Sequence, residues 1–176
     1  MNTLFNTDFN LEQSSHNKST VSLETNTFQL SENGLDLKLT IIETSGFGDQ
    51  INKENSHEPI LKYINDQYEA KVQNELGLNR NFEQINDKIV HVCLYFISPT
   101  GHSLKTIDVN TMKALDRKVN IIPIIAKADT IGKNELNDFK KRVIADINKN
   151  HIDIYYFPIN DFDLDISNLN AATNVS

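Results

Sequence analysis

An apolar run at residues 119–126, with no alternation between polar and apolar positions, constrains the fold of this chain most strongly. Strands with this pattern lie in the middle of parallel sheets, where both strand faces are buried. Parallel neighbours are joined by crossover helices, and those helices cover the faces of the sheet. The run therefore predicts a three-layer α/β fold with a mostly parallel sheet.

The rest of the chain alternates between strand and helix patterns. Apolar residues at every second position from Leu35 to Ile41 predict a strand with one buried face, and a turn at 32–34 joins it to a strand at 21–30 as a hairpin. Further along, we expect helices at 59–76, 108–118 and 134–147, the last capped by Asn134, and strands at 90–97 and 152–157. In such a fold, ligands bind at the carboxyl ends of the parallel strands.

Composition narrows the possible partners and the compartment. The chain has 176 residues, 39% of them hydrophobic, which suits one domain, and its net charge of −7 argues against a nucleic-acid partner or a broad lipid-binding surface. The single cysteine, Cys93, and the nearby His91 fall inside the apolar run at 90–97, so we expect both side chains in the core. A lone cysteine fits a reducing, cytoplasmic compartment, and we expect neither a signal segment nor a membrane span.

Two polar side chains directly follow the apolar run at 119–126. The carboxylate of Asp129 can accept hydrogen bonds from the N1 and N2 donors of guanine, which adenine lacks, while the Lys127 stem can pack over the base. The alternative is a solvated lysine beside an aspartate that caps a helix. Guanine recognition therefore depends on the motifs that accompany this pair.

Three such segments together resemble the GTP-binding domain of septins: Ser45-Gly46-Phe47-Gly48-Asp49-Gln50, the stretch at 96–105, and Ala126-Lys127-Ala128-Asp129. The resemblance runs from near Thr3 to about Pro158. It implies a P-loop-GTPase-like fold, incomplete at both ends, with residues 1–176 forming a partial septin-type GTP-binding domain. It also implies GTP or GDP with Mg²⁺, other septins as filament partners, and a cytoskeletal location at the division site or cell cortex.

The segment Glu43-Thr44-Ser45-Gly46 resembles the part of GTPases that meets the metal and the terminal phosphate. GTPases usually carry aspartate at the first position, which binds Mg²⁺ through water, and the glycine amide meets the γ-phosphate. Here the first residue is Glu43, whose extra methylene displaces the carboxylate. Such a displacement can cost catalysis roughly 10²-fold. Glu43 is thus either a weakened Mg²⁺ ligand or an ordinary carboxylate at the end of a strand, and Gly46 contributes its backbone.

The resemblance aligns Thr20 with a threonine that, in hydrolytic septins, helps to hold Mg²⁺ and the attacking water. Thr20 is thereby a candidate catalytic residue and metal ligand, and its presence favours hydrolysis while Glu43 disfavours it. The alternative is a polar loop, because the surrounding segment is rich in serine and asparagine.

No G-x-x-x-x-G-K-[ST] phosphate loop occurs in the chain. The glycine-rich backbone and lysine of that loop would normally hold the phosphates. In septins the helix after this loop resembles Met1–Thr7, so the expected position of the loop is immediately before Met1. We therefore do not expect stable GTP binding by these residues alone, and we expect any membrane association to depend on parts outside this chain.

Three more residues are singled out by the resemblance. In septin filaments the nucleotide lies between neighbouring GTP-binding domains, and His102 and Glu135 match positions that face across that interface. Thr130 lies beside the base-binding loop. The alternatives are a solvated loop histidine and a charge that favours the first turn of a helix.

Three functions stay open at this point. The first is a septin filament subunit that holds GTP structurally, with slow or no hydrolysis. The second is an active septin GTPase, and the third is a nucleotide-free module that interacts with other septins.

Overall fold

The computed structural model describes residues 21–32, 34–48, 55–76 and 88–157. Chain contacts separate two units, residues 1–59 and 60–176. Among the described helices, none is long and apolar enough to cross a membrane.

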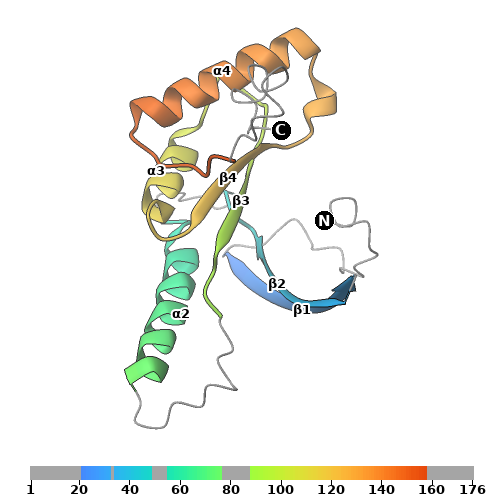
Figure 1. The fold of residues 1–176 in the computed structure, drawn as a ribbon. Helices are drawn as coiled ribbons and strands as arrows, with labels where there is room; N and C mark the ends of the chain where they lie inside the picture. Colours follow the sequence, from blue (N-terminus) through green and yellow to red (C-terminus); the bar gives the residue numbers. More distant parts are fainter. Residues whose placement is uncertain (1–20, 33, 49–54, 77–87, 158–176) are drawn as a thin grey trace. The chain divides into compact units, whose positions relative to one another are not determined.

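The first unit contains the expected hairpin. Strands β1 (Ser22–Glu32) and β2 (Leu35–Ser45) pair antiparallel, with Glu32 opposite Leu35 next to the turn (Figure 1). Gly34 in that turn has φ +80°, a left-handed conformation that glycine adopts without steric cost. The turn and the alternating pattern together set the register of the pair, so the predicted hairpin is confirmed.

The prediction that one face of the second strand is buried is wrong near the turn. Leu35 and Leu37 are 77% and 59% exposed, and Leu39 and Ile41 are half-buried. Among the described residues of this unit, Val21 and Ser56 are the buried ones. A two-stranded ribbon has no second layer of its own to pack against. Alternation therefore predicts that the segment is a strand, but it does not predict that another layer buries its apolar face.

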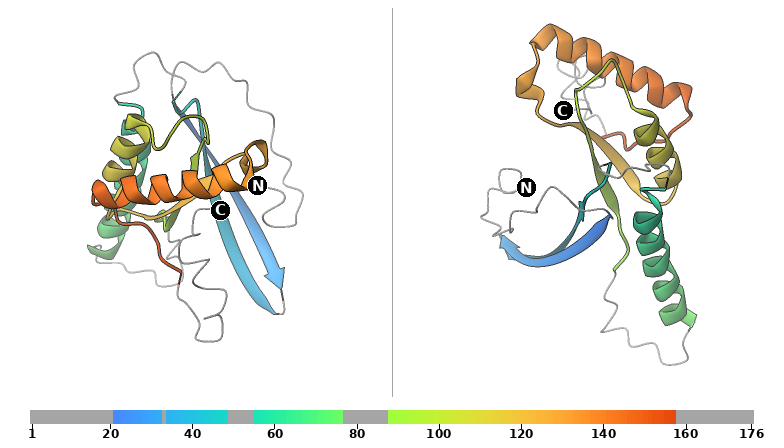
Figure 2. Two further views of the ribbon diagram at one scale, coloured as in Figure 1. Left: turned by 90° about the horizontal axis from the view of Figure 1, so that it is seen from above. Right: turned by 180° about the vertical axis from the view of Figure 1, so that it is seen from behind.

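The second unit is built on a parallel pair of strands. Strands β3 (Val92–Ile97) and β4 (Asn120–Ile125) pair from Val92↔Asn120 to Ile97↔Ile125, and helix α3 (Thr106–Leu115) connects them. Helices α2 (Glu58–Leu76) and α4 (Lys133–Lys149) are the other described α-helices (Figures 1 and 2). The parallel pair with a helical crossover confirms the expected α/β pattern.

One face of this parallel pair forms the core with α3 and α4. The buried side chains come from alternate strand positions and from one face of each helix. The apolar ones are Tyr95, Ile97, Ile121, Pro123 and Ile125 in the strands, Met112 and Leu115 in α3, and Phe139, Val143 and Ile147 in α4.

The opposite face of the pair is less covered within the described residues. Val92 and Phe96 are 46% and 51% exposed, and Leu94, Ile122 and Ile124 are half-buried. The run at 119–126 predicted that both faces of its strand are buried. Within the described residues, one face is buried.

Several element boundaries differ from those expected. Helix α3 spans Thr106–Leu115 rather than 108–118, and the left-handed Arg117 (φ 60°) follows its end. Gly132, not Asn134, occupies the N-cap position of α4, and no side chain caps that end. Helix α2 agrees with the expected 59–76, although Ile64 is its one buried residue.

The predicted strand at 152–157 is not formed. Ile152 and Ile154 are buried and alternate with exposed Asp153 and Tyr155, so the segment does follow the predicted pattern. Its backbone joins β4 through one bond, in which Tyr155 N donates to Ile121 O at 2.8 Å. A strand needs a continuous ladder, and a single backbone hydrogen bond does not provide one.

His91 does not lie in the core. Its side chain is exposed, and it precedes the first residue of β3. Its carbonyl accepts hydrogen bonds from Asn120 N at 3.2 Å and Asn120 Nδ2 at 3.0 Å. The prediction of burial placed His91 inside a strand at 90–97, whereas β3 begins at Val92.

Cys93 is half-buried on β3, and burial raises the pKa of its thiol from the ordinary value of 9.0 to about 11. We expect iodoacetamide at pH 8 to alkylate the folded chain roughly 10²-fold more slowly than the urea-unfolded chain, because the thiolate is the nucleophile. Since the folded pKa is the higher one, this thiol stabilises the fold fully below pH 9 and progressively less up to pH 11. Equal alkylation rates in the two states would contradict this environment.

Candidate functional site

The carboxyl ends of β3 and β4 lie side by side. Ile97 pairs with Ile125, and Ala126 N donates to Ile97 O at 2.8 Å, so the ladder continues to the last residue of both strands. The loops that follow therefore leave the sheet at one edge (Figure 1). One of them carries His102 and the other carries Lys127 and Asp129.

The turn after β4 has an uncommon backbone conformation. Lys127 is left-handed, with φ 52° and ψ 41°, and the 3₁₀ turn Ala128–Thr130 follows it. A left-handed lysine is unfavourable unless its surroundings impose it, and such conformations concentrate at functional sites. Here Thr130 supplies that constraint, because its N and Oγ1 donate to Lys127 O at 3.0 and 2.7 Å.

This turn exposes both side chains that were expected to meet the base. The side chains of Lys127 and Asp129 are solvent-exposed at the strand edge. Because backbone and hydroxyl contacts hold the turn, these side chains are available to a ligand. The hydroxyl of Thr130 belongs to the turn itself, a role that its position beside the motif did not reveal.

Glu135 and His102 occupy exposed positions. Glu135 lies in the first turn of α4, where a carboxylate interacts favourably with the helix dipole. His102 lies in the loop at 98–105, one residue after the left-handed Gly101 (φ +109°). Both positions agree with a surface role and equally with the solvated alternatives.

Sequence reasoning missed two hydrogen bonds, one from that loop to α4 and one from β3 to α3. Ser103 Oγ donates a hydrogen bond to Asp146 Oδ2 on α4. Tyr95 OH, on the buried face of β3, donates to Asp108 Oδ1 at 2.9 Å, in the first turn of α3. Burial and the neighbouring Asp108 charge hold the pKa of Tyr95 well above its usual range, so Tyr95 stays a protonated donor. No local pattern could reveal these pairs, since their members are far apart in the sequence.

Gly46 and Glu43 lie at the end of β2, in the first unit. Gly46 has φ +80°, directly after the strand. Glu43 is half-buried and pairs with Glu24 of β1, so two carboxylates lie on one face of the hairpin. Thr20, the candidate switch residue, lies outside the described residues.

The described residues do not form a metal cage. Among them, no group of three or more His, Cys, Asp or Glu side chains could hold a metal ion. Mg²⁺ commonly uses one or two carboxylates together with substrate phosphates, so Glu43 is compatible with that mode as a single candidate ligand.

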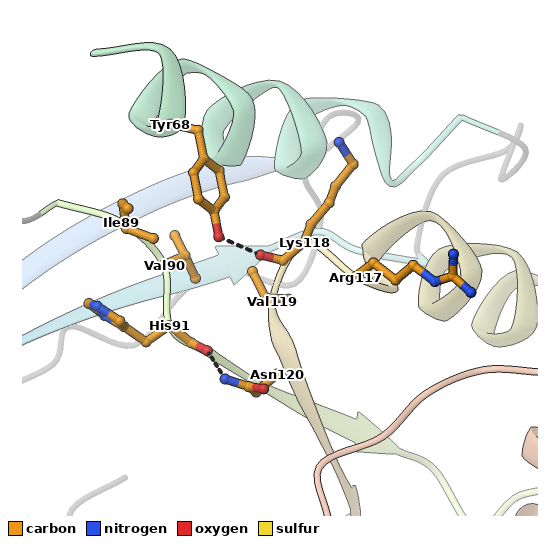
Figure 3. Close-up of a pocket in the computed structure, with 8 residues that line it drawn as sticks. All are labelled: Tyr68, Ile89, Val90, His91, Arg117, Lys118, Val119 and Asn120. Carbon is orange, nitrogen blue, oxygen red and sulfur yellow. Dashed lines mark hydrogen bonds between the residues drawn. The ribbon is translucent and has the colours of Figure 1, made fainter. Parts of the chain in front are cut away.

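A hollow of about 250 Å³ lies at the other ends of the parallel strands. Figure 3 shows two hydrogen bonds between residues that line it: Tyr68 OH donates to Lys118 O at 2.7 Å, and Asn120 Nδ2 donates to His91 O. The Lys118 ammonium donates to Asn65 Oδ1 at 2.8 Å, and the Arg117 guanidinium points away from the hollow. Tyr68 OH, Asn120 Nδ2 and the Lys118 ammonium are therefore already hydrogen-bonded within the chain, and the hollow does not extend the edge that carries Lys127.

Comparisons with known proteins all lead to one family. The family model described as Septin matches residues 1–175. Septin-11 from Bos taurus is 50% identical over 175 residues, covering 99% of this chain and 41% of that protein. Septin-8-A from Danio rerio is 55% identical over 161 residues, covering 92% and 38%. The chain therefore spans less than half the length of these curated relatives.

Solved structures agree on the fold. The crystal structure of Cdc11 from Saccharomyces cerevisiae matches with TM-score 0.62 and 33% identity, over 84% of this chain and 65% of that one. The septin GTPase domain from Chlamydomonas reinhardtii has the same TM-score of 0.62 at 23% identity, over 81% and 51%, and supports the fold alone. The expected GTPase-like α/β fold is thereby confirmed.

Proposed function

This chain belongs to the septin family, and from that premise we propose that it is a guanine-nucleotide-binding filament subunit with slow or no hydrolysis. In this proposal residues 1–176 are part of a septin-type GTP-binding domain. The nucleotide, GTP or GDP, lies at an interface with another septin, and the assembly is a cytoplasmic, cytoskeletal filament.

The turn at 127–130 is the observation that carries this proposal. Its backbone is held in an unfavourable conformation by Thr130, and it exposes Asp129 and Lys127 at the carboxyl edge of a parallel strand. That is the edge where ligands bind in open α/β sheets. Asp129 accepts the two donors of guanine, and the Lys127 stem packs against the base plane.

The interface part of the proposal is supported by the loop after β3. His102 is exposed at the same sheet edge as the base-recognising turn, and Glu135 is exposed in the next helix. A neighbouring septin would meet these side chains next to the nucleotide.

Slow hydrolysis is proposed because of Glu43. Its carboxylate replaces the usual aspartate, and Mg²⁺, when bound with the phosphates, would have this side chain as a candidate ligand. Mg²⁺ supplies charge neutralisation on the phosphates, and Glu43 would position it less favourably than aspartate. Thr20 supports the alternative of an active GTPase.

A nucleotide-free interaction module is the other candidate. In that case the chain would contact other septins without holding a nucleotide. Base recognition and phosphate binding contribute separately to the affinity for a nucleotide. The two candidate functions therefore predict different results when the chain is titrated with nucleosides and nucleotides.

Titration of the 176-residue chain with nucleosides and nucleotides tests the proposal. Followed by NMR chemical shifts, guanosine should perturb residues of the 127–130 turn, adenosine should not, and GTP should bind less than about tenfold more tightly than guanosine. Any bound GTP should persist for hours in a single-turnover assay with Mg²⁺. Equal binding of guanosine and adenosine would contradict base recognition, rapid cleavage would favour the GTPase, and no binding at all would favour the interaction module.

A further inference from the structure

The loop at 98–105 connects β3 to α3 and is bound at its far end by two carboxylates. Ser103 Oγ donates to Asp146 Oδ2, and Lys105 N donates to Asp108 Oδ2 at 3.1 Å. Ser103 and Asp146 are both half-buried. A hydroxyl that donates to an ionised carboxylate makes a stronger hydrogen bond than a neutral pair does, and partial burial reduces competition from water.

Asp108 ties the end of this loop to the core. Its Oδ1 accepts from Tyr95 OH, which is 7% exposed on β3, while its Oδ2 accepts from the loop backbone. The conformation at Lys105 is therefore fixed by the packed core, whatever happens at Ser103.

The preceding part of the loop has weaker support. The left-handed Gly101 precedes His102, and the hydroxyls of Ser98 and Thr100 are 3.1 Å apart at the surface. Without the bond from Ser103 to Asp146, the segment that carries His102 would lose its side-chain link to α4.

Helix α4 is a suitable support for that link. Asp146 lies between the buried positions Val143 and Ile147, both 0% exposed, so the core fixes this part of the helix. The same helix begins at Lys133, shortly after the base-recognising turn at 127–130. One rigid element therefore connects the turn and the loop that carries His102.

We propose that Ser103 and Asp146 are positioning residues, whose hydrogen bond fixes the loop at 98–105 on α4 and so sets the place of His102 at the subunit interface. This inference rests on the proposed function for the role of that interface. The positioning itself is a property of this chain and is measured separately.

The test uses the 176-residue chain and the variants Ser103→Ala, Asp146→Ala and Ser103→Thr. The His102 imidazole signals, identified by His102→Gln, should move to random-coil positions in both alanine variants and return in Ser103→Thr, which keeps the hydroxyl. Guanosine affinity should change less than about twofold, because the turn at 127–130 is intact.

Ser98→Ala is the matched control, since it removes an exposed hydroxyl from the same loop. It should leave the His102 signals unchanged. Wild-type His102 signals in both alanine variants would overturn the positioning role, even where guanosine binds normally. A wild-type chain that fails to bind guanosine would contradict the proposed function instead, and the imidazole signals would still report the loop.

Discussion

Asp129→Asn should weaken binding of guanosine by roughly 10²-fold. The exposed Asp129 carboxylate is the group expected to accept both the N1 and N2 donors of guanine. Asparagine offers one acceptor and places an amide donor against the second guanine donor. A hydrogen bond to a charged group contributes about 1.5–3 kcal/mol, so losing this arrangement corresponds to one to two powers of ten in affinity.

Xanthosine separates base recognition from general damage to the turn. Xanthine presents an oxygen where guanine presents its amino group, so the asparagine amide can donate to it, and xanthosine binding should be retained or improved. Asp138→Asn is the control, because it removes an exposed carboxylate from α4 with the same change of charge. Equal loss for guanosine and xanthosine, or equal loss in Asp138→Asn, would contradict the assigned role of Asp129.

Elements whose signals are local were predictable from the sequence. The hairpin follows from a turn at 32–34 that precedes an alternating strand, and Gly34 adopts the positive φ that such a turn needs. Helix α2 and the pair β3 and β4 likewise follow from hydrophobic periodicity and from parallel pairing across a crossover.

The predictions that were wrong concern structure that depends on residues far away in the sequence. The segment at 152–157 has the alternation of a strand, but a ladder also requires a neighbour with unpaired groups in register. The exposed Leu35 and Leu37 show the same limit, because alternation identifies which side chains share a face without identifying a layer to cover that face.

In the candidate site, too, features with a local signal were predictable and contacts between distant residues were not. The positions of Lys127 and Asp129 at the carboxyl end of a parallel strand were predictable, because both residues directly follow an apolar run, and ligand-binding loops occur at such ends. The pairs Ser103–Asp146 and Tyr95–Asp108 were not, because each joins an element to another element through a single hydrogen bond. Nothing in the local sequence of Ser103 distinguishes a tethered hydroxyl from a solvated one.

Phe139→Ala should lower the free energy of unfolding of the second unit by about 3–5 kcal/mol. Phe139 is 2% exposed and shares the inner face of α4 with Val143 and Ile147. Small domains are stabilised by only about 5–15 kcal/mol in total, so this one change removes a large part of that margin. Urea unfolding monitored by far-UV circular dichroism measures the loss, and Ile147→Val, expected to cost about 0.5–1.5 kcal/mol, gives a folded variant of the same core.

Phe96→Ala is the matched control, because it removes the same side chain from the opposite, open face of the parallel pair. Phe96 is 51% exposed, so about half of its surface remains in contact with water in the folded state. Burial of a complete phenylalanine side chain contributes about 1.5–3 kcal/mol, and the expected cost here is therefore near 1 kcal/mol. A cost equal to that of Phe139→Ala would mean that a further layer covers this face in solution, and one-sided burial of the pair would be wrong.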